Sequence, residues 1–381
     1  MTANAPRVGI IGGGQLARMM APAAVPLGIH LRVLADTADD PAAQVLPDVS
    51  LGDYRDLDTL REFAAGCDVV TFDHEHVPPE HLRTLEDEGV ALRPGPASLL
   101  YAQDKLAMRE RLTAIGVPCP AYRAVDSVAE VAAFATEVGW PLVLKTPRGG
   151  YDGKGVWVVA DVVAAAAVLA QLGGATLLAE ELVEFRQELS VLVARSPLGQ
   201  AVAYPVVQTV QADGVCREVI APAPGLSEEH AVHAEQAALE IAHQLGVTGV
   251  MAVEMFDTER GVLVNELAMR PHNSGHWTID GAVTDQFEQH LRAVLDLPLG
   301  VPYLRAPYAV MVNILGGARQ DLRSGFVHAL ARDTALRVHV YGKTVKPGRK
   351  VGHVTVAGDD LDALLSRGRE AAAYLGGDHD G

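Results

Sequence analysis

A loop near the middle of the chain combines glycines and lysines in a way that suits phosphate binding. Four of the seven residues in 149–155 are glycine, and Lys154 lies among them. Because each glycine costs conformational entropy when it is ordered, packing alone does not explain this composition. Such a loop can close over phosphates and present backbone N–H groups to them, with Lys145 as a second cation. The P-loop pattern is absent, and an exposed hairpin without a ligand is the alternative.

Two glutamates on neighbouring predicted strands could hold a metal ion. Glu254 lies in an alternating apolar segment, Glu266 ends the next one, and the turn between them surrounds Arg260. A hairpin there would place both carboxylates on one face, where they repel each other unless a cation lies between them. Carboxylates suit Mg²⁺, and Asn265 adds an amide oxygen. Glutamates on a solvated strand face are the alternative, but the glycine loop and the lysines favour a nucleotide with Mg²⁺.

The first apolar run ends in a glycine turn that resembles a dinucleotide-binding fingerprint. Residues 12–17 fit the pattern G-x-G-x-x-G/A, and Asp36 follows 19 residues after Ala17. In that fingerprint an acidic side chain at this distance holds a ribose hydroxyl. Other phosphate-binding folds use the same turn, and so does a tight strand-to-helix connection without a ligand. An NAD-dependent oxidoreductase therefore stays open as an alternative.

The chain is acidic overall and carries one local basic cluster. It has 31 Lys and Arg residues against 48 Asp and Glu residues, a formal charge of −17. This charge argues against broad nucleic-acid binding, which needs a basic face. Lys343, Lys346, Arg349 and Lys350 nevertheless place four cations within eight residues. Such a cluster can hold a phosphate dianion, although a solvated basic turn is the simpler alternative.

Neither a membrane segment nor a disulfide framework is predicted. The longest wholly apolar run, Val162–Ala170, has nine residues, whereas a bilayer span needs about 20. The N-terminus lacks the pattern of a signal peptide. Three widely spaced cysteines argue against a disulfide scaffold and against a cysteine-rich zinc site. We therefore expect a cytoplasmic protein that binds no membrane.

The elements that must position these residues follow an α/β pattern. At the N-terminus, a strand over 8–11, a helix over 15–27 and strands over 31–35 and 68–72 predict a parallel sheet with crossover helices. Residues 93–96 interrupt this pattern. The later elements are a helix over 104–115, strands over 141–145, 156–159 and 177–193, a helix over 228–245, and a hairpin over 249–257 and 261–266. Three prolines in 298–307 precede a small β-rich unit.

Several strings resemble the ATP-grasp carboxylate–amine ligases and, among them, the N5-carboxyaminoimidazole ribonucleotide synthetase family. The order of the nucleotide-site residues along the chain is that of the superfamily: Lys105, Lys145, the glycine loop, residues 180–183, Glu188, Glu254 and the pair Asn265-Glu266. The strings that resemble the family are G-Q-L-A-R-M at 14–19, the glycine loop at 149–155, N-E-L-A at 265–268, H-N-S-G-H-W-T at 272–278 and P-G-R-K-V-G-H at 347–353. Of these, H-N-S-G-H-W-T and P-G-R-K-V-G-H are the specific ones. The resemblance covers about residues 7–355. It implies ATP-dependent carboxylation of 5-aminoimidazole ribonucleotide with bicarbonate, through carboxyphosphate, in purine biosynthesis. Another ATP-grasp ligase and a nucleotide sensor without turnover are the nearest alternatives.

The resemblance also implies the domain organisation. We expect a Rossmann-like domain over 1–100, an ATP-grasp domain over 101–300 with a lid subdomain over about 118–184, and a small β-rich domain over 301–381. The fold class is α/β, with α+β character in the ATP-grasp part. Family members are generally homodimers, so a homodimer is expected.

ATP would lie between the two β-rich units of the ATP-grasp domain. Lys105 and Lys145 would contact the phosphates, Glu180 and the backbone near Val183 the adenine edge, and Glu188 the ribose hydroxyls. Glu254 and Glu266 would hold two Mg²⁺ ions. The full ATP-binding set implied is Lys105, Lys145, Gly150, Tyr151, Asp152, Gly153, Lys154, Gly155, Val156, Glu180, Glu181, Leu182, Val183, Glu188, Gln211, Asn265 and Glu266.

The acceptor and ribonucleotide sites follow from the same resemblance. Arg270 would bind bicarbonate, with a structural salt bridge as the alternative, and His276 is a candidate general base. The catalytic set implied is Arg270, Tyr151, Asp152, Asn273, Ser274 and His276, and the ribonucleotide set is Gly14, Gln15, Leu16, Glu75, Lys343, Arg349 and Lys350. Glu75 would suit ribose hydroxyls and the basic cluster the phosphate, while Asp36 would not bind NAD.

The sequence departs from the family pattern at three places. Met269 replaces an expected proline, Gln211 stands where a histidine often contacts the nucleotide, and residues 73–76 read D-H-E-H instead of E-x-E-N. None of these changes removes a charge that the mechanism needs.

Overall fold

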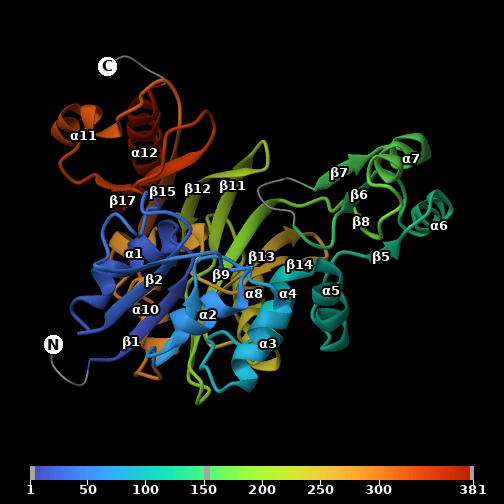
Figure 1. The fold of residues 1–381 in the computed structure, drawn as a ribbon. Coiled ribbons are helices and arrows are strands. Elements are labelled where there is room, and N and C mark those ends of the chain that lie inside the picture. Colours follow the sequence, from blue (N-terminus) through green and yellow to red (C-terminus); the bar gives the residue numbers. More distant parts are fainter. Residues whose placement is uncertain (1–4, 150–154, 378–381) are drawn as a thin grey trace.

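Three β-sheets and the helices around them form the part of the chain that the structure describes, residues 5–149 and 155–377 of a computed structural model. A parallel sheet lies at the N-terminus, a nine-stranded antiparallel sheet occupies the middle, and a four-stranded antiparallel sheet projects to one side (Figure 1). The mixed α/β class expected from the sequence is confirmed. Among these residues, no helix combines the length and the apolar composition needed to cross a bilayer.

The N-terminal sheet is fully parallel, as predicted. Its strands, in spatial order, are β3 (Asp48–Leu51), β2 (His30–Ala35), β1 (Arg7–Ile11) and β4 (Val69–Phe72). The helices that accompany it are α1 (Gln15–Ala24), α2 (Leu57–Ala64), α3 (Pro79–Asp87) and α4 (Pro96–Gln103). Strand β4 is wholly apolar or threonine and buried at every position, as expected for a parallel strand covered on both faces. Helix α1 ends three residues before the predicted Leu27.

The projecting sheet is a small unit with its own core. Its strands, in spatial order, are β5 (Tyr122–Val125), β8 (Leu177–Glu181), β6 (Leu142–Lys145) and β7 (Val156–Val159). Helices α6 (Val128–Val138) and α7 (Val162–Gln171) pack on it through Val131, Phe134 and Ala165. Lys145 pairs with Val156 at the loop end of the β6–β7 hairpin, so the glycine-rich segment connects these two strands. We call this unit the lid.

The central sheet runs through the rest of the molecule. Its path is β14 (Gly261–Ala268), β13 (Gly249–Thr258), β9 (Gln187–Arg195), β11 (Val207–Ala212), β12 (Val215–Ala221), β15 (Tyr308–Leu315), β17 (Lys350–Gly358) and β16 (Arg337–Val340), with β10 (Ala201–Ala203) beside β9. The helices around it are α5 (Lys105–Ala114), α8 (Glu228–Gln244), α9 (Thr278–Gly281), α10 (Gln286–Val294), α11 (Phe326–Arg332) and α12 (Leu361–Gly376). The predicted C-terminal strands therefore extend the central sheet, through four residue pairs between β12 and β15.

A buried histidine joins the N-terminal sheet to the central sheet. His290, on α10, accepts the Val250 N–H at Nδ1 over 2.9 Å, so its Nε2 carries the hydrogen and donates to Thr71 Oγ1 over 2.8 Å. Burial lowers the pKa of His290 to about 3. The imidazole is therefore neutral at physiological pH, and its two bonds connect α10 with one strand from each sheet.

Candidate active site

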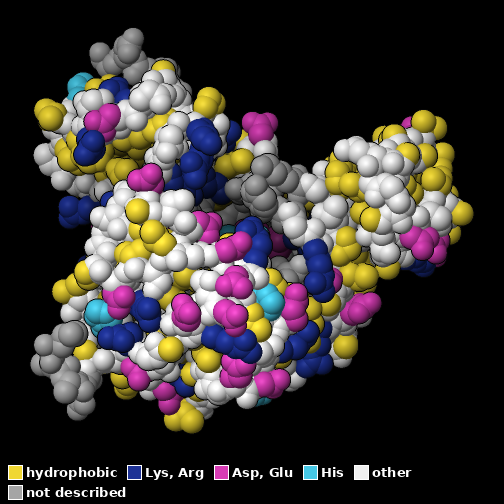
Figure 2. Space-filling view, viewed as in Figure 1, with side chains coloured by type: hydrophobic (Ala, Val, Ile, Leu, Met, Phe, Trp, Pro, Cys, Tyr) yellow, Lys and Arg dark blue, Asp and Glu magenta, His cyan; other side chains and the backbone are white. Residues whose placement is uncertain are grey.

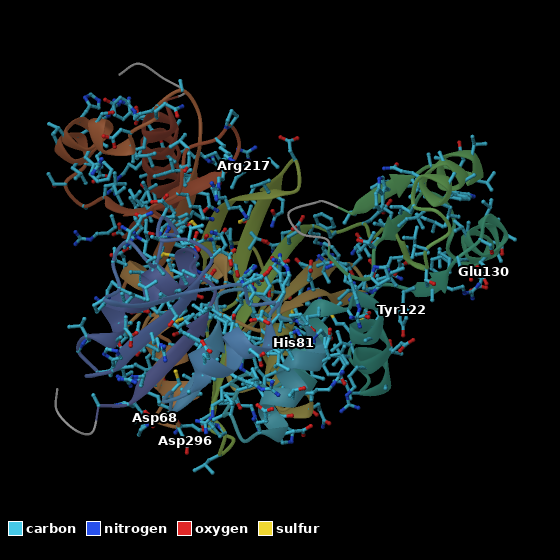
Figure 3. All side chains as sticks on the ribbon, in the orientation of Figure 1. Asp68, His81, Tyr122, Glu130, Arg217 and Asp296 are labelled. Atoms are coloured by element: carbon cyan, nitrogen blue, oxygen red, sulfur yellow. The ribbon has the colours of Figure 1, made fainter. Side chains whose placement is uncertain are left out.

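The candidate site lies where the lid, helix α5, the β13–β14 hairpin and the C-terminal strands approach one another. Figure 2 shows Lys and Arg side chains gathered around the hollow between these parts. Figure 3 shows Tyr122 at the base of the lid and Glu130 at its outer end, so the lid extends away from the central sheet. Gly150, Tyr151, Asp152, Gly153 and Lys154 lie outside the described residues.

The two predicted metal ligands face each other across the β13–β14 hairpin. Glu254 pairs directly with Glu266, which confirms the predicted hairpin. The register then shifts, because Met255 pairs with Val264 and leaves Asn265 as an extra residue in β14. A bulge of this kind re-aims side chains beside active sites. Asn265 and Glu266 are both half-buried although they are consecutive, whereas Val264 and Leu267 on either side are buried.

The electrostatics of this pair suit a divalent cation. Burial raises the pKa of Glu254 to about 7, with further contributions from the negative charges of Glu266 and Glu188. The ammonium of Lys105 forms an ion pair with Glu266. A divalent cation between the two carboxylates would offset their repulsion and favour the charged form of Glu254. Two carboxylates and an amide oxygen are hard ligands that suit Mg²⁺, which takes its remaining ligands from phosphates and water.

A buried ion network holds the second predicted phosphate-binding lysine. Lys145 Nζ lies 2.6 Å from Glu180 Oε2 and donates to Asn265 Oδ1 over 3.3 Å. The other oxygen of Glu180 accepts from Arg109 Nε over 2.5 Å. Glu180 is only 2% exposed, and both of its oxygens are bonded to cations. This corrects the expectation that its carboxylate reads the adenine edge, because the carboxylate holds Lys145 instead.

Arg109 is a residue that the sequence analysis missed. It lies on α5 one turn after Lys105, and its side chain is fully buried. Its guanidinium also donates to the carbonyl oxygens of Val264 and Asn265, over 3.0 and 2.7 Å. The available signal was its position next to Met108 on the helix face that Leu112 also occupies, where a charged side chain needs a buried partner.

The segment after β8 leads from the lid to the central sheet. Glu181 Oε1 accepts from the Ala121 N–H over 3.0 Å and from Arg260 over 2.9 Å, so this carboxylate anchors the start of β5. Leu182 is 44% exposed and Val183 is buried. Backbone groups of this segment remain candidates for the adenine contact, in place of the acidic side chains.

Glu188 lies on the central-sheet side of the candidate nucleotide site. Burial raises its pKa, and a hydrogen bond from Gln211 acts in the opposite direction. The two side chains come from β9 and β11, which are paired strands. Gln211 therefore contacts another member of the predicted ATP-binding set.

Arg270 is held by Glu75 from the N-terminal domain. Its Nε donates to Glu75 Oε2 over 2.8 Å, and the other oxygen of Glu75 accepts the Met269 N–H over 3.0 Å. Burial alone lowers the pKa of Arg270, but the Glu75 carboxylate more than compensates and the pKa is raised. Both oxygens of Glu75 thus hold the Met269–Arg270 segment, and a further bond from ribose hydroxyls, as the resemblance implies, stays a prediction.

The H-N-S-G-H-W-T string forms a short 3-10 turn, η1 (Asn273–Gly275), beside the site. Asn273 exchanges two amide hydrogen bonds with Asn313 of β15, over 2.8 and 3.0 Å. Ser274 is buried and bonds to Ser190 Oγ at 2.7 Å. Asn313, which fixes the amide of Asn273, was also missed in the sequence.

His276 belongs to the core and not to the pocket. It is fully buried, its Nδ1 bonds to Gln286 at 2.8 Å, and its ring stacks on His353 at 5.2 Å. Burial lowers the pKa of both histidines well below the ordinary value. The structure does not support a general base at His276, because its ring has no exposed surface.

The N-terminal glycine turn is filled by the protein's own side chains. Asp73 Oδ1 accepts the Ala17 N–H over 2.8 Å at the start of helix α1, where a dinucleotide fold binds pyrophosphate. A Cβ at Gly14 would overlap the Asp73 carboxylate, and one at Gly12 would lie 2.7 Å from the His74 ring. These glycines are explained by close packing, which removes the reason for the NAD alternative.

The basic C-terminal segment reaches the site at the start of β17. Lys350 is close enough to lower the pKa of Glu254, while burial and neighbouring carboxylates raise it overall. Lys343 lies 5.8 Å from the centre of the Tyr341 ring. Arg349 is exposed and donates to the Thr344 carbonyl over 3.3 Å. The segment thus brings positive charge to the edge of the hollow.

Three protein families match successive parts of the chain. Residues 5–103 match the ribonucleotide synthetase preATP-grasp domain, residues 110–287 the ATP-grasp domain, and residues 309–367 the phosphoribosylaminoimidazole carboxylase C-terminal domain. The hairpin with Glu254 and Glu266 lies in the second region and the basic cluster in the third.

Relatives and solved structures agree over almost the whole chain. The N5-carboxyaminoimidazole ribonucleotide synthase of Mycobacterium tuberculosis is 54% identical, covering 97% of this chain and 88% of its own. The Thermus thermophilus N5-carboxyaminoimidazole ribonucleotide synthetase structure is 40% identical with a TM-score of 0.88, covering 97% and 98%. The Aspergillus clavatus N5-carboxyaminoimidazole synthase, in complex with ADP and 5-aminoimidazole ribonucleotide, is 32% identical with a TM-score of 0.88, covering 98% and 99%. Identities of this size over nearly full lengths support more than a shared fold.

Proposed function

The chain belongs to the N5-carboxyaminoimidazole ribonucleotide synthase family, and from that membership we propose how its residues divide the work of the reaction. It is an ATP-dependent ligase that carboxylates 5-aminoimidazole ribonucleotide to N5-carboxyaminoimidazole ribonucleotide in purine biosynthesis. The observation that carries the residue assignment is the pairing of Glu254 with Glu266 beside Lys105. This arrangement combines paired carboxylates with cations, as a nucleotide–metal site requires.

ATP would bind between the lid and the central sheet. Lys105 and Lys145 would contact the phosphates, and Glu188 with Gln211 would contact the ribose. The backbone of 181–183 would contact adenine, and residues 150–156 would close over the triphosphate. Glu254, Glu266 and Asn265 would hold two Mg²⁺ ions. When bound, Mg²⁺ would neutralise charge on the phosphates as the γ-phosphoryl group is transferred.

Arg270 would bind bicarbonate in the orientation that Glu75 gives it. A bicarbonate oxygen attacks the γ-phosphorus, the bond to ADP breaks, and carboxyphosphate forms. The ribonucleotide's exocyclic amine then attacks the carboxyl carbon, and phosphate leaves as the amine loses a proton. Asn273, fixed by Asn313, and Ser274 would border this pocket. Because carboxyphosphate is short-lived in water, closure of the lid would protect it.

The ribonucleotide would bind between the N-terminal turn and the basic segment. Lys343, Arg349 and Lys350 would hold its phosphate, and residues 14–16 would lie along the remainder. Tyr151 and Asp152 would approach the imidazole from the lid. A homodimer and a cytoplasmic location are further proposals, and both rest on the family resemblance alone.

The reaction can be tested by ADP release from Mg-ATP. We expect release to depend on both 5-aminoimidazole ribonucleotide and bicarbonate, with one carboxylated product per ADP. ADP release that does not depend on the ribonucleotide would indicate that another amine is the acceptor. Nucleotide binding without any release would instead support a sensor.

The basic segment gives a specific kinetic prediction. Arg349→Ala removes a cation that would pair with the substrate phosphate, so the KM for the ribonucleotide should rise about tenfold. The KM for ATP should stay within about twofold, because Arg349 lies outside the proposed ATP set. Steady-state kinetics with each substrate varied in turn measures both. Arg323→Ala removes another exposed arginine of the C-terminal part and is the control. Equal changes in both KM values would contradict the assignment of the basic cluster to the phosphate of the ribonucleotide.

A further inference from the structure

Arg109 is enclosed at the junction of three elements that carry the ATP site. Its side chain has no exposed surface, so it contacts neither solvent nor a nucleotide in the hollow. It donates to Glu180 Oε1 on β8 over 2.5 Å and to the Val264 and Asn265 carbonyls on β14 over 3.0 and 2.7 Å. One side chain of α5 thus bonds to the lid sheet and to the edge strand of the central sheet.

Each of these partners leads directly to a proposed phosphate or metal ligand. Glu180 bonds to Lys145 Nζ at 2.6 Å, and Lys145 also reaches Asn265 Oδ1. The Asn265 carbonyl belongs to the bulge that directs Glu266, and Glu266 pairs with Lys105 on the same helix as Arg109. The contacts close a ring around Arg109 through α5, β14, β6 and β8.

The type of side chain at this position matters. Burying a charge is costly unless partners satisfy its hydrogen bonds. The planar guanidinium has donors in a fixed fork and can serve Glu180 and two carbonyls at once, whereas an ammonium is a compact point charge. Two cations also hold the Glu180 carboxylate, and together they lower its pKa although burial raises it. Without Arg109, Glu180 would keep Lys145 alone as its charged partner among the bonds described here.

We propose that Arg109 is a positioning residue that sets Lys145 and the Asn265–Glu266 bulge in register for ATP and its metal. The inference rests on the proposed function of these ligands, and it adds a residue that touches no substrate. It explains why a fully buried arginine lies between the lid and the central sheet, where an apolar side chain would pack at lower electrostatic cost.

The test is the kinetic effect of Arg109→Met, which keeps much of the volume and removes the charge and the fork. We expect the KM for Mg-ATP to rise at least tenfold and kcat to fall, while the KM for the ribonucleotide changes less than twofold. Calorimetric titration with ADP, with and without Mg²⁺, should show weaker binding in both cases because Lys145 is displaced. Arg109→Lys should recover part of the loss. Arg111→Met is the matched control. Arg111 lies two residues further along α5, and among the described contacts its side chain bonds only to the Gln244 carbonyl.

A purely structural role for Arg109 would leave the KM values and the ADP affinity of the folded enzyme unchanged. It would lower the melting temperature and the active fraction, but folded enzyme would keep wild-type KM values and ADP affinity, which would overturn the proposal. If Arg109→Met does not fold, Arg109→Lys decides: we expect a two- to fivefold rise in the KM for Mg-ATP, and a wild-type value refutes the inference. Wild-type enzyme that releases no ADP with the ribonucleotide and bicarbonate would instead count against the proposed function.

Discussion

Glu266→Gln is expected to lower the rate of Mg²⁺-dependent ATP cleavage by about 1,000-fold, a loss typical for one electrostatic element of a catalytic site. The amide keeps the size of the side chain but cannot supply the charge that faces Glu254 across the hairpin. It also breaks the ion pair with Lys105. Because Glu266 is half-buried at the edge of the hollow, the fold should tolerate the change.

The measurement is single-turnover ADP formation at saturating ATP over a range of Mg²⁺ concentrations. Glu259→Gln is the matched control, since it makes the same change at an exposed position in the turn of the same hairpin. We expect the control to keep wild-type rates. Near-normal turnover of Glu266→Gln at low Mg²⁺ would show that the metal is held elsewhere.

The elements of the site could be read from sequence because they depend on local pattern. Alternation of apolar residues and one turn sufficed to pair Glu254 with Glu266. The bulge at Asn265 could not be predicted, because a register shift depends on which partner residues meet across the strands. This bulge is nevertheless the reason why Asn265 and Glu266, although consecutive, both border the site.

The roles of individual charges were harder to predict than their presence. Glu180 and Glu75 are acidic residues near a nucleotide site, and the sequence suggested that each binds the ligand. In the structure each carboxylate holds a cation of the protein, Lys145 for Glu180 and Arg270 for Glu75, which the sequence did not indicate. Those partners lie 35 and 195 residues away along the chain, beyond the reach of spacing arguments.

The C-terminal segment shows the same limit at the level of the sheet. Prolines before Tyr308 predict a separate small unit, and that segment does have a core of its own around α12. Strand β15 nevertheless pairs with β12 and brings Asn313 against Asn273. An edge strand such as β12 has unpaired backbone groups that can bond to any suitable strand, and the sequence pattern does not indicate which strand will pair with it.

The buried histidines predict marked acid lability. His276, His290 and His353 have no exposed surface, and burial lowers the pKa of each, to about 3 for His290. In the unfolded chain their pKa returns to about 6.5. Their neutral form is therefore fully stabilising above pH 6.5, and stability is lost as the pH falls below that value, because the unfolded state then binds three more protons.

Glu254 acts in the opposite direction, so its proton must be subtracted from the number that the histidines take up on unfolding. Its pKa is raised to about 7 in the folded state, so between pH 7 and 4.5 the folded chain binds about one proton more there than the unfolded chain. Unfolding below about pH 6 should then take up about two protons from these four groups. That corresponds to a loss of about 2–3 kcal/mol in the free energy of unfolding for each pH unit.

Urea unfolding at pH 7.5, 6.0 and 5.5 measures the total slope, to which His74 and His272 add in the same direction, because burial lowers their pKa values to about 4 and about 3. His290→Gln can accept the Val250 N–H and donate to Thr71 without titrating, so it should reduce the slope by about one proton, or about 1.4 kcal/mol per pH unit. His233→Gln, at an exposed position on α8, should leave the slope unchanged. An unfolding free energy that stays level down to pH 5.5 would mean that these imidazoles gain protons without unfolding. The stack of His276 on His353, which joins the H-N-S-G-H-W-T string to the last strand pair, would then have to open to water in the folded protein.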